Sequence, residues 1–163
     1  MEGDDVMYNR ERAVAYANTY WNSHNPAFRF FRTDDCTNFI SQCLYAGGFP
    51  MVGGRDRTKG WWYRQGRPDN WSYSWAVANS FYWFLRSRAQ QVSRVEDLQL
   101  GDVICYDFEG DGRWNHSTIV TYKDENGQAY VNAHTNNSQY RYWPYQDSAA
   151  WTPRIKYAFF HIR

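Results

Sequence analysis

The chain has few aliphatic side chains: Leu, Ile, Val and Phe together fill 28 of its 163 positions. So low a content accompanies disorder when the net charge is also high. Here the formal net charge is +1, and aromatic residues make up 20% of the chain, so Trp and Tyr supply the apolar area that aliphatic residues lack. We therefore expect one folded domain, residues 1–163, with its core between about residues 8 and 162.

The chain also lacks long apolar runs and a strong charge of either sign. No run approaches the roughly 20 apolar residues of a membrane span, and the opening segment MEGDDVMYNR is acidic and polar, unlike a signal peptide. We expect a soluble monomer, which is extracellular or associated with the cell wall if it is excised from a secreted parent. Near-neutral charge argues against a nucleic-acid partner, because such binding depends on many phosphate contacts.

Cysteine and histidine are scarce and irregularly spaced. Three cysteines without a CxxC pair argue against a disulfide framework and leave at least one thiol free. His24 and His161 belong to no HExxH motif and form no pair with metal-ligand spacing. We therefore expect no metal and no cofactor. The sequence also has no phosphate loop, dinucleotide fingerprint or serine nucleophile elbow.

The first half of the chain has helical periodicity. Apolar residues at helical spacing predict helices over residues 8–23, from near Asp35 to Ala46, and over residues 75–88. The pair Gly47-Gly48 ends the second of these helices. Residues 50–74 contain Gly, Pro, Arg and Trp without a period, which indicates a long functional loop or an irregular insertion.

After residue 98 the apolar pattern alternates, which predicts strands. They begin with DVICYDF after Gly101 and continue with HSTIVTY, a tight turn at DENG and its partner QAYVNAHT. Residues 139–143 and 155–162 add two more strands. Helices followed by antiparallel strands predict an α+β domain with N-terminal helices packed on an antiparallel sheet.

Cys36 is predicted to lie in the first turn of the second helix. Unpaired amides and the helix dipole favour a thiolate there and lower the pKa of a cysteine, particularly beside a basic partner. The neighbouring Asp34 and Asp35 oppose that effect unless they turn away as helix caps. The alternative interpretation is a small buried apolar residue, and that interpretation fits Cys43 and Cys105.

His116 opens a strand directly after a polar loop, so its ring can face a cleft and take the proton of a thiol. If the hairpin turns at DENG, the partner strand brings Asn132 and His134 alongside, both on one face of the sheet. Either side chain can then orient the imidazole, which is the third role in nucleophile, base and orienter catalysis. We expect the Cys36 sulfur within about 4 Å of a ring nitrogen of His116.

Five segments together resemble a known family: YNRERAVAYANTYW, DCTNFISQCLYAGG, LQLGDVICYD, NHSTIVT and YVNAHTNN. They are similar, in this order and over about residues 8–160, to the putative amidase domain family of the NlpC/P60 and CHAP type. The resemblance implies a papain-like cysteine peptidase fold.

The resemblance also implies roles for residues: Cys36 as the nucleophile, His116 as the general base and Asp35 as a cap or loop anchor. Relatives carry His, Asn, Gln or Glu at the third position. The AHT motif of the family favours His134 as the third catalytic residue, while an ungapped match to the related FVHAS pattern favours Asn132. Asn132 is either the alternative third residue or a neighbour that lines the pocket.

The implied reaction is hydrolysis of an amide or peptide bond through a thioester, with bacterial cell-wall peptide as the substrate at the level of the family. The backbone N–H of Cys36 is the natural first donor to the oxyanion. The second hypothesis is a catalytically idle domain of the same fold that binds a glycan or peptide. Tryptophans near the site either form a substrate platform or pin their own loop to the body: Trp61, Trp62, Trp71, Trp75 and Trp114.

Overall fold

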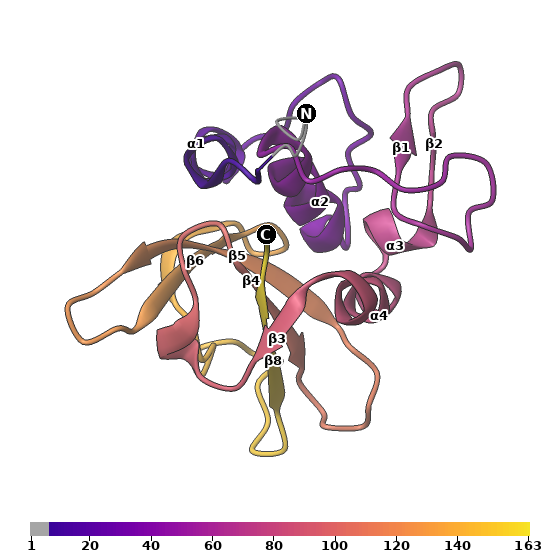
Figure 1. Cartoon of the computed structure of the whole chain (residues 1–163). Helices are drawn as coiled ribbons and strands as arrows, with labels where there is room; N and C mark the ends of the chain where they lie inside the picture. Colours follow the sequence, from indigo (N-terminus) through magenta and orange to yellow (C-terminus); the bar gives the residue numbers. More distant parts are fainter. Residues whose placement is uncertain (1–6) are drawn as a thin grey trace.

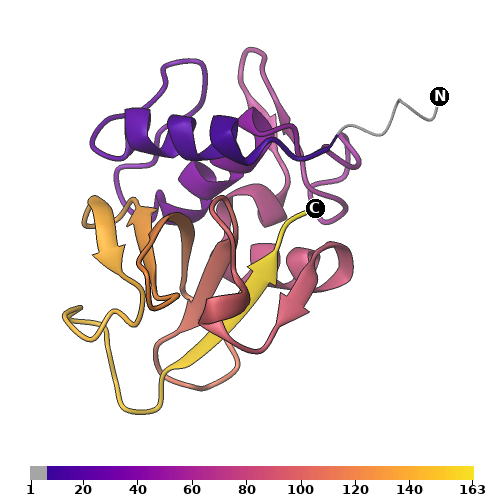
Figure 2. The ribbon, with the colours of Figure 1, turned by 60° about the vertical axis from the view of Figure 1, so that its left-hand side comes forward.

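Two helices of eleven residues each cover one face of a six-stranded sheet (Figure 1). They are α1 (Arg10–Tyr20) and α2 (Cys36–Ala46). The computed structural model describes residues 7–163, so most of the acidic opening segment, residues 1–6, lies outside the described residues. Figure 2 shows α1 and α2 above the strands of the sheet. The predicted α+β arrangement is confirmed.

Every neighbouring pair of strands in this sheet is antiparallel. The strands, in spatial order, are β3 (Gln90–Val92), β8 (Lys156–His161), β4 (Val103–Asp107), β5 (His116–Lys123), β6 (Ala129–Ala133) and β7 (Ser138–Tyr142). The hairpin predicted at DENG joins β5 to β6. The pattern did not predict β3, which forms the edge of the sheet against β8.

The segment between α2 and the sheet is mostly irregular, as its composition predicts. It holds the two-residue strands β1 (Tyr63–Arg64) and β2 (Asn70–Trp71), which pair with each other. The helix predicted over residues 75–88 is divided into α3 (Tyr73–Ala76) and α4 (Ala78–Arg88), because Val77 has extended backbone angles. A short 3-10 turn, η2 (Val95–Asp97), follows β3.

Capping and glycine geometry fix the ends of the two N-terminal helices. The Asn9 side chain accepts a hydrogen bond from the Arg12 backbone and caps α1, which therefore begins at Arg10. After α2, Gly48 has a φ of 88°, a conformation that glycine adopts without a steric cost. The predicted end of α2 at the glycine pair is confirmed, while α1 is shorter than its apolar pattern predicts.

The core is divided by the sheet into two apolar clusters. The cluster on the helix side contains Phe39 of α2 and Ile119 of β5, and the other contains Tyr106, Val120 and Tyr145. Successive residues of β5 therefore enter different clusters, as strand alternation requires. No helix in residues 7–163 has both the length and the apolar character needed to cross a membrane.

Candidate active site

Cys36 is the first residue of α2 and borders a cavity of about 360 Å³. Asp34, just before the helix, has a φ of 54°, which an aspartate tolerates better than most residues. The side chain of Cys36 is 5% exposed, whereas Cys43 and Cys105 are fully buried. Of the three cysteines, Cys36 is therefore the one that lines this cavity.

The surroundings of the Cys36 sulfur favour a protonated thiol. Burial raises its pKa, and a charge on Asp34 raises it further. Hydrogen bonds to the sulfur from the Thr37 side chain and from the backbone of Ser117 and Thr37 act in the opposite direction. The Thr37 hydroxyl lies 3.8 Å from the sulfur. The helix N-terminus therefore does not by itself make Cys36 a thiolate.

His116 is the first residue of β5, where it pairs with Tyr106 of β4. Its ring lies among the rings of Tyr106, Phe108 and Tyr145. Nε2 is 2.9 Å from the Tyr145 hydroxyl. Burial, with a smaller contribution from the charge on Arg141, lowers the pKa of His116 to about 3. The imidazole is therefore neutral at neutral pH.

The start of α2 and the start of β5 are in contact. The Thr37 hydroxyl lies 3.3 Å from that of Ser117, the residue after His116. Within residues 7–163, however, no hydrogen bond joins the Cys36 sulfur to the His116 ring; the hydrogen bonds of the sulfur are those with Thr37 and Ser117. The structure thus brings the two segments together without a direct thiol–imidazole hydrogen bond.

The loop before His116 is held at both ends. The buried carboxylate of Asp107 accepts hydrogen bonds from the backbone of Gly110 and Gly112, and Asn115 accepts one from Phe108. Asn79 of α4 accepts a hydrogen bond from the Trp114 backbone. These bonds fix the wall of the Cys36 cavity that leads directly into His116.

His134 follows β6 and binds the N-terminal end of α2. Its Nδ1 lies 2.6 Å from the Asp35 carboxylate, and its Nε2 lies 2.7 Å from the carbonyl oxygen of Tyr20. Its ring stacks on Phe39 with centroids 3.9 Å apart. Both ring nitrogens are therefore engaged, and neither bonds to His116.

Asp35 makes no side-chain capping bond on α2. The oxygen that does not bind His134 accepts hydrogen bonds from the Phe31 backbone and the Asn38 side chain. Asp35 therefore anchors the loop before α2 to the helix and, through His134, to the sheet. Such an anchor fixes the position of the neighbouring Cys36.

Asn132 lies on β6 opposite Ile119 of β5. Its amide nitrogen donates to Asn18 of α1, and its oxygen accepts from Thr121 and from the backbone of Tyr140. Like His134, Asn132 faces the helices, while the ring of His116 packs with the cluster on the other side of the sheet. The register does not bring either residue to His116.

Most of the tryptophans singled out from the sequence belong to the core. Trp61, Trp62 and Trp75 are at most 2% exposed, and their indole N–H groups donate to Ser41, to the backbone of residues 56 and 59, and to Asn38, respectively. In this conformation they present no face to a ligand. Trp71 is half-buried, and Trp114 borders the Cys36 cavity.

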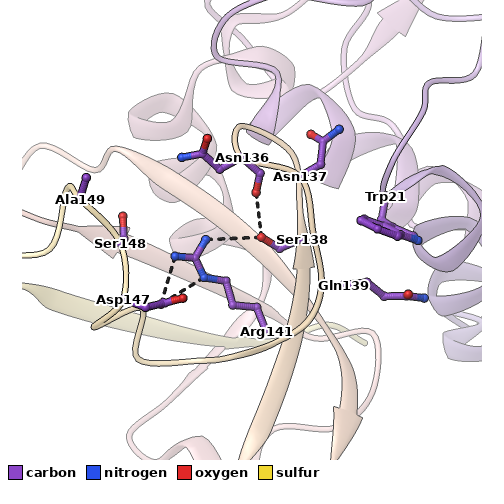
Figure 3. A pocket seen from close by; sticks show the side chains of 9 residues that line it. All are labelled: Trp21, Asn136, Asn137, Ser138, Gln139, Arg141, Asp147, Ser148 and Ala149. Atoms are coloured by element: carbon purple, nitrogen blue, oxygen red, sulfur yellow. Dashed lines mark hydrogen bonds and ion pairs between the residues drawn. The ribbon is translucent and has the colours of Figure 1, made fainter.

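The Cys36 cavity shares lining residues with two neighbouring cavities. Asn79 is shared with a cavity of about 430 Å³, and Asp34 is shared with one of about 420 Å³ that His134 also borders. The latter shares residues 136 and 137 with a shallow pocket of about 750 Å³ that contains Arg141 (Figure 3). Adjacent cavities of this kind suit an extended ligand.

Sequence reasoning missed Tyr145, Asn79 and Arg113, which contact His116 or border the Cys36 cavity. Tyr145 lies in the irregular segment YWPYQD, where no motif or period marks it. Asn79 lies near the start of the helix predicted over residues 75–88, and Arg113 lies in the loop before His116. These positions are the only indications that the sequence gives for the two residues. Within residues 7–163, no group of three His, Cys, Asp or Glu side chains is arranged to hold a metal.

Comparison with known proteins gives one family and two relatives. A family model described as "putative amidase domain" matches residues 7–160. Uncharacterized protein YhbB of Bacillus subtilis is 54% identical over 98% of this chain and 52% of its own length. Uncharacterized protein YjcM of the same organism is 29% identical over 80% of this chain and 31% of its own length. The chain thus spans about half or less of these relatives. No solved structure matches it.

Proposed function

Because the chain belongs to the putative amidase domain family, we propose that it is a cysteine-dependent amide or peptide hydrolase with a papain-like fold of the NlpC/P60 and CHAP type. Cys36 is the nucleophile and His116 the general base. One observation carries the proposal: the most exposed of the three thiols begins α2 and borders a cavity that is also lined by Asn115, the residue directly before His116. Family membership implies an amide substrate.

The reaction starts from a neutral thiol and a neutral imidazole, since burial raises the pKa of Cys36 and lowers that of His116. The thiol proton moves to the imidazole as sulfur attacks the carbonyl carbon, and the imidazolium then protonates the departing amine. Water hydrolyses the resulting thioester. The backbone N–H of Cys36 has no backbone acceptor within residues 7–163 and is available to the oxyanion.

The proposed substrate is an extended peptide, with bacterial cell-wall peptide as the first choice. Two cavities that share Asn79 or Asp34 with the Cys36 cavity support this choice, because they leave room near the thiol for several residues of a substrate. Asp34 and Arg113 place charges of both signs beside the thiol. Such a lining suits a peptide that carries both amino and carboxyl groups.

The test is hydrolysis of purified peptidoglycan, beside a panel of peptide amides, followed by the release of new amino groups. Cys36→Ala should abolish release, while Cys43→Ala, the same change on the same helix but inside the core, should retain it in the folded fraction. Equal activity in Cys36→Ala and the wild type would refute the proposal.

The third catalytic role assigned from the sequence to His134, with Asn132 as the alternative, stays a prediction. His134→Ala should lower turnover more than Asn132→Ala if the assignment holds. His134 also contacts Asp35 and Phe39, so its removal can lower turnover in a second way, by displacing the N-terminal end of α2. Melting temperatures of the two variants separate these routes, since displacement also destabilises the fold.

A catalytically idle binding domain is the second candidate, and the raised pKa of Cys36 favours it. In that case the Cys36 cavity and its neighbours hold a peptide or glycan without cleaving it. Calorimetric titration with peptidoglycan fragments distinguishes the two: the idle domain binds them equally well as wild type and Cys36→Ala, and neither protein releases amino groups.

A further inference from the structure

His116 has one side-chain hydrogen bond within residues 7–163, and its partner is Tyr145. The two ring centroids are 5.1 Å apart, and both side chains are buried. No hydrogen bond within the described residues engages the other ring nitrogen, Nδ1. Nδ1 is not completely enclosed by the protein, because it is absent from the fully buried polar atoms that lack a hydrogen-bond partner. Tyr145 therefore fixes one end of the imidazole and leaves the other end accessible.

Tyr145 is itself held in place by its surroundings. Its φ is 60°, and its carbonyl accepts a hydrogen bond from the Ser148 backbone. The guanidinium of Arg141 lies over its ring, 3.8 Å from the centroid. Figure 3 shows that Arg141 in turn bonds to Asp147 and Ser138. These contacts hold the Tyr145 side chain in the position where its hydroxyl meets His116.

Tyr145 also lies within electrostatic range of the nucleophile. Burial is the main cause that raises the pKa of Tyr145, and a charge on Cys36 raises it further, while Arg141 lowers it. The net effect is a raised pKa, so the phenol keeps its proton at neutral pH. A neutral hydroxyl can accept a hydrogen bond from an imidazole without taking part in proton transfer.

We propose that Tyr145 is the positioning residue of the hydrolase proposed above, with its oxygen accepting a hydrogen bond from Nε2–H of His116. The proposal rests on that function, because it fixes which nitrogen acts as the base. With the ring proton on Nε2, the lone pair of Nδ1 is free to take the proton of Cys36. The ring then carries both protons, and Nδ1–H delivers the transferred one to the departing amine. Tyr145 neither gains nor loses a proton.

This assignment competes with the one made from the sequence. The two nitrogens of His134 are engaged by Asp35 and by a backbone carbonyl, and the amide of Asn132 is engaged by its own three partners. Within residues 7–163, Tyr145 is the side chain that hydrogen-bonds to the base. His134 and Asn132 bond instead to residues of α1 and to Asp35 at the start of α2.

A spectroscopic test is independent of turnover. Nitrogen-15 spectra of the imidazole groups at pH 7 should show His116 as the Nε2–H tautomer, its signals being identified by their loss in His116→Gln. In Tyr145→Phe the same ring should become a mixture of both tautomers, whereas Tyr8→Phe should leave it unchanged. Tyr8 is a suitable control because it is also buried and its hydroxyl bonds a distant carbonyl, that of Gly101. An Nδ1–H tautomer in the wild-type protein would overturn the proposal.

A kinetic test uses purified peptidoglycan. Tyr145→Phe should lower kcat about 10- to 100-fold, the loss expected of a hydrogen bond to a group that becomes charged, and leave KM within about twofold. Tyr8→Phe should change neither. If wild type and Cys36→Ala are equally inactive, the proposed function fails and the tautomer alone decides the positioning role. If Cys36-dependent hydrolysis is found and Tyr145→Phe matches Tyr8→Phe, only the positioning role fails.

Discussion

Burial of a neutral His116 should make the protein less stable in acid. The pKa of His116 is lowered from about 6.5 to about 3 by burial and by the charge on Arg141. Between these values the unfolded chain binds a proton that the folded protein does not, so the free energy of unfolding falls as the pH falls. The loss begins near pH 6.5, grows by about 1.4 kcal/mol per pH unit and ends near pH 3.

At pH 4.5 this linkage amounts to about 2 to 3 kcal/mol relative to pH 7.5. Protonation of carboxyl groups adds its own loss, so the informative quantity is the difference between wild type and a variant without the imidazole. We expect His116→Gln to lose about 2 to 3 kcal/mol less than wild type between the two pH values. His24→Gln, which removes an exposed histidine, should lose as much as wild type.

Urea titrations followed by tryptophan fluorescence measure these free energies at each pH. The substitution also removes packing and the bond to Tyr145, but that cost is present at both pH values and cancels from the comparison. If wild type and His116→Gln lose the same stability on acidification, His116 is not buried as a neutral base. The proposed proton transfer would then lose its starting state.

Three further outcomes test the site and the fold. Iodoacetamide at pH near 7 should modify Cys36 well before the two fully buried cysteines, as peptide mass spectrometry would show, and equal slow modification of all three would contradict an accessible nucleophile. Gly60→Ala should lower the free energy of unfolding by more than about 2 kcal/mol, because the new Cβ would lie 2.0 Å from the Val52 carbonyl oxygen. Gly112 also has a positive φ but faces open space, so Gly112→Ala should lower the free energy of unfolding by only about 1 kcal/mol, and thermal melts compare the two variants. Asp102→Asn should cost about 2 to 4 kcal/mol, because its buried carboxylate bonds an arginine, a histidine and two backbone N–H groups; a change below 0.5 kcal/mol in urea titrations would refute that role.

Periodicity predicts the regular part of this fold well, because it reports which face of an element is apolar. For that reason it predicted α2 and the strands β4 to β8. It missed β3, whose residues Gln90–Val92 are mostly polar and form an edge strand through backbone bonds to β8. A strand that buries little has no apolar pattern to detect.

The fate of the tryptophans depended on partners far away in the sequence. Trp61 and Trp75 are buried because Ser41 and Asn38 of α2 accept their indole N–H groups inside the core. In the sequence alone, polar residues such as Ser41 and Asn38 are typical of the exposed face of a helix. Only the tertiary structure shows that α2 is enclosed on both sides, by the sheet and by the segment that carries the tryptophans.

The surroundings of His116 were hard to predict because they depend on one irregular residue pair in a hairpin. Near the turn, Tyr122 pairs with Tyr130, but beyond a bulge Val120 pairs with Val131 rather than with Asn132. Continuing the first register would have placed His134 opposite Thr118, on the face of the sheet that His116 occupies. The bulge shifts the partner strand by one residue and moves its side chains to the opposite face. It therefore turns Asn132 and His134 toward the helices. The side chain that bonds to His116 is instead Tyr145, which lies in the segment after β7.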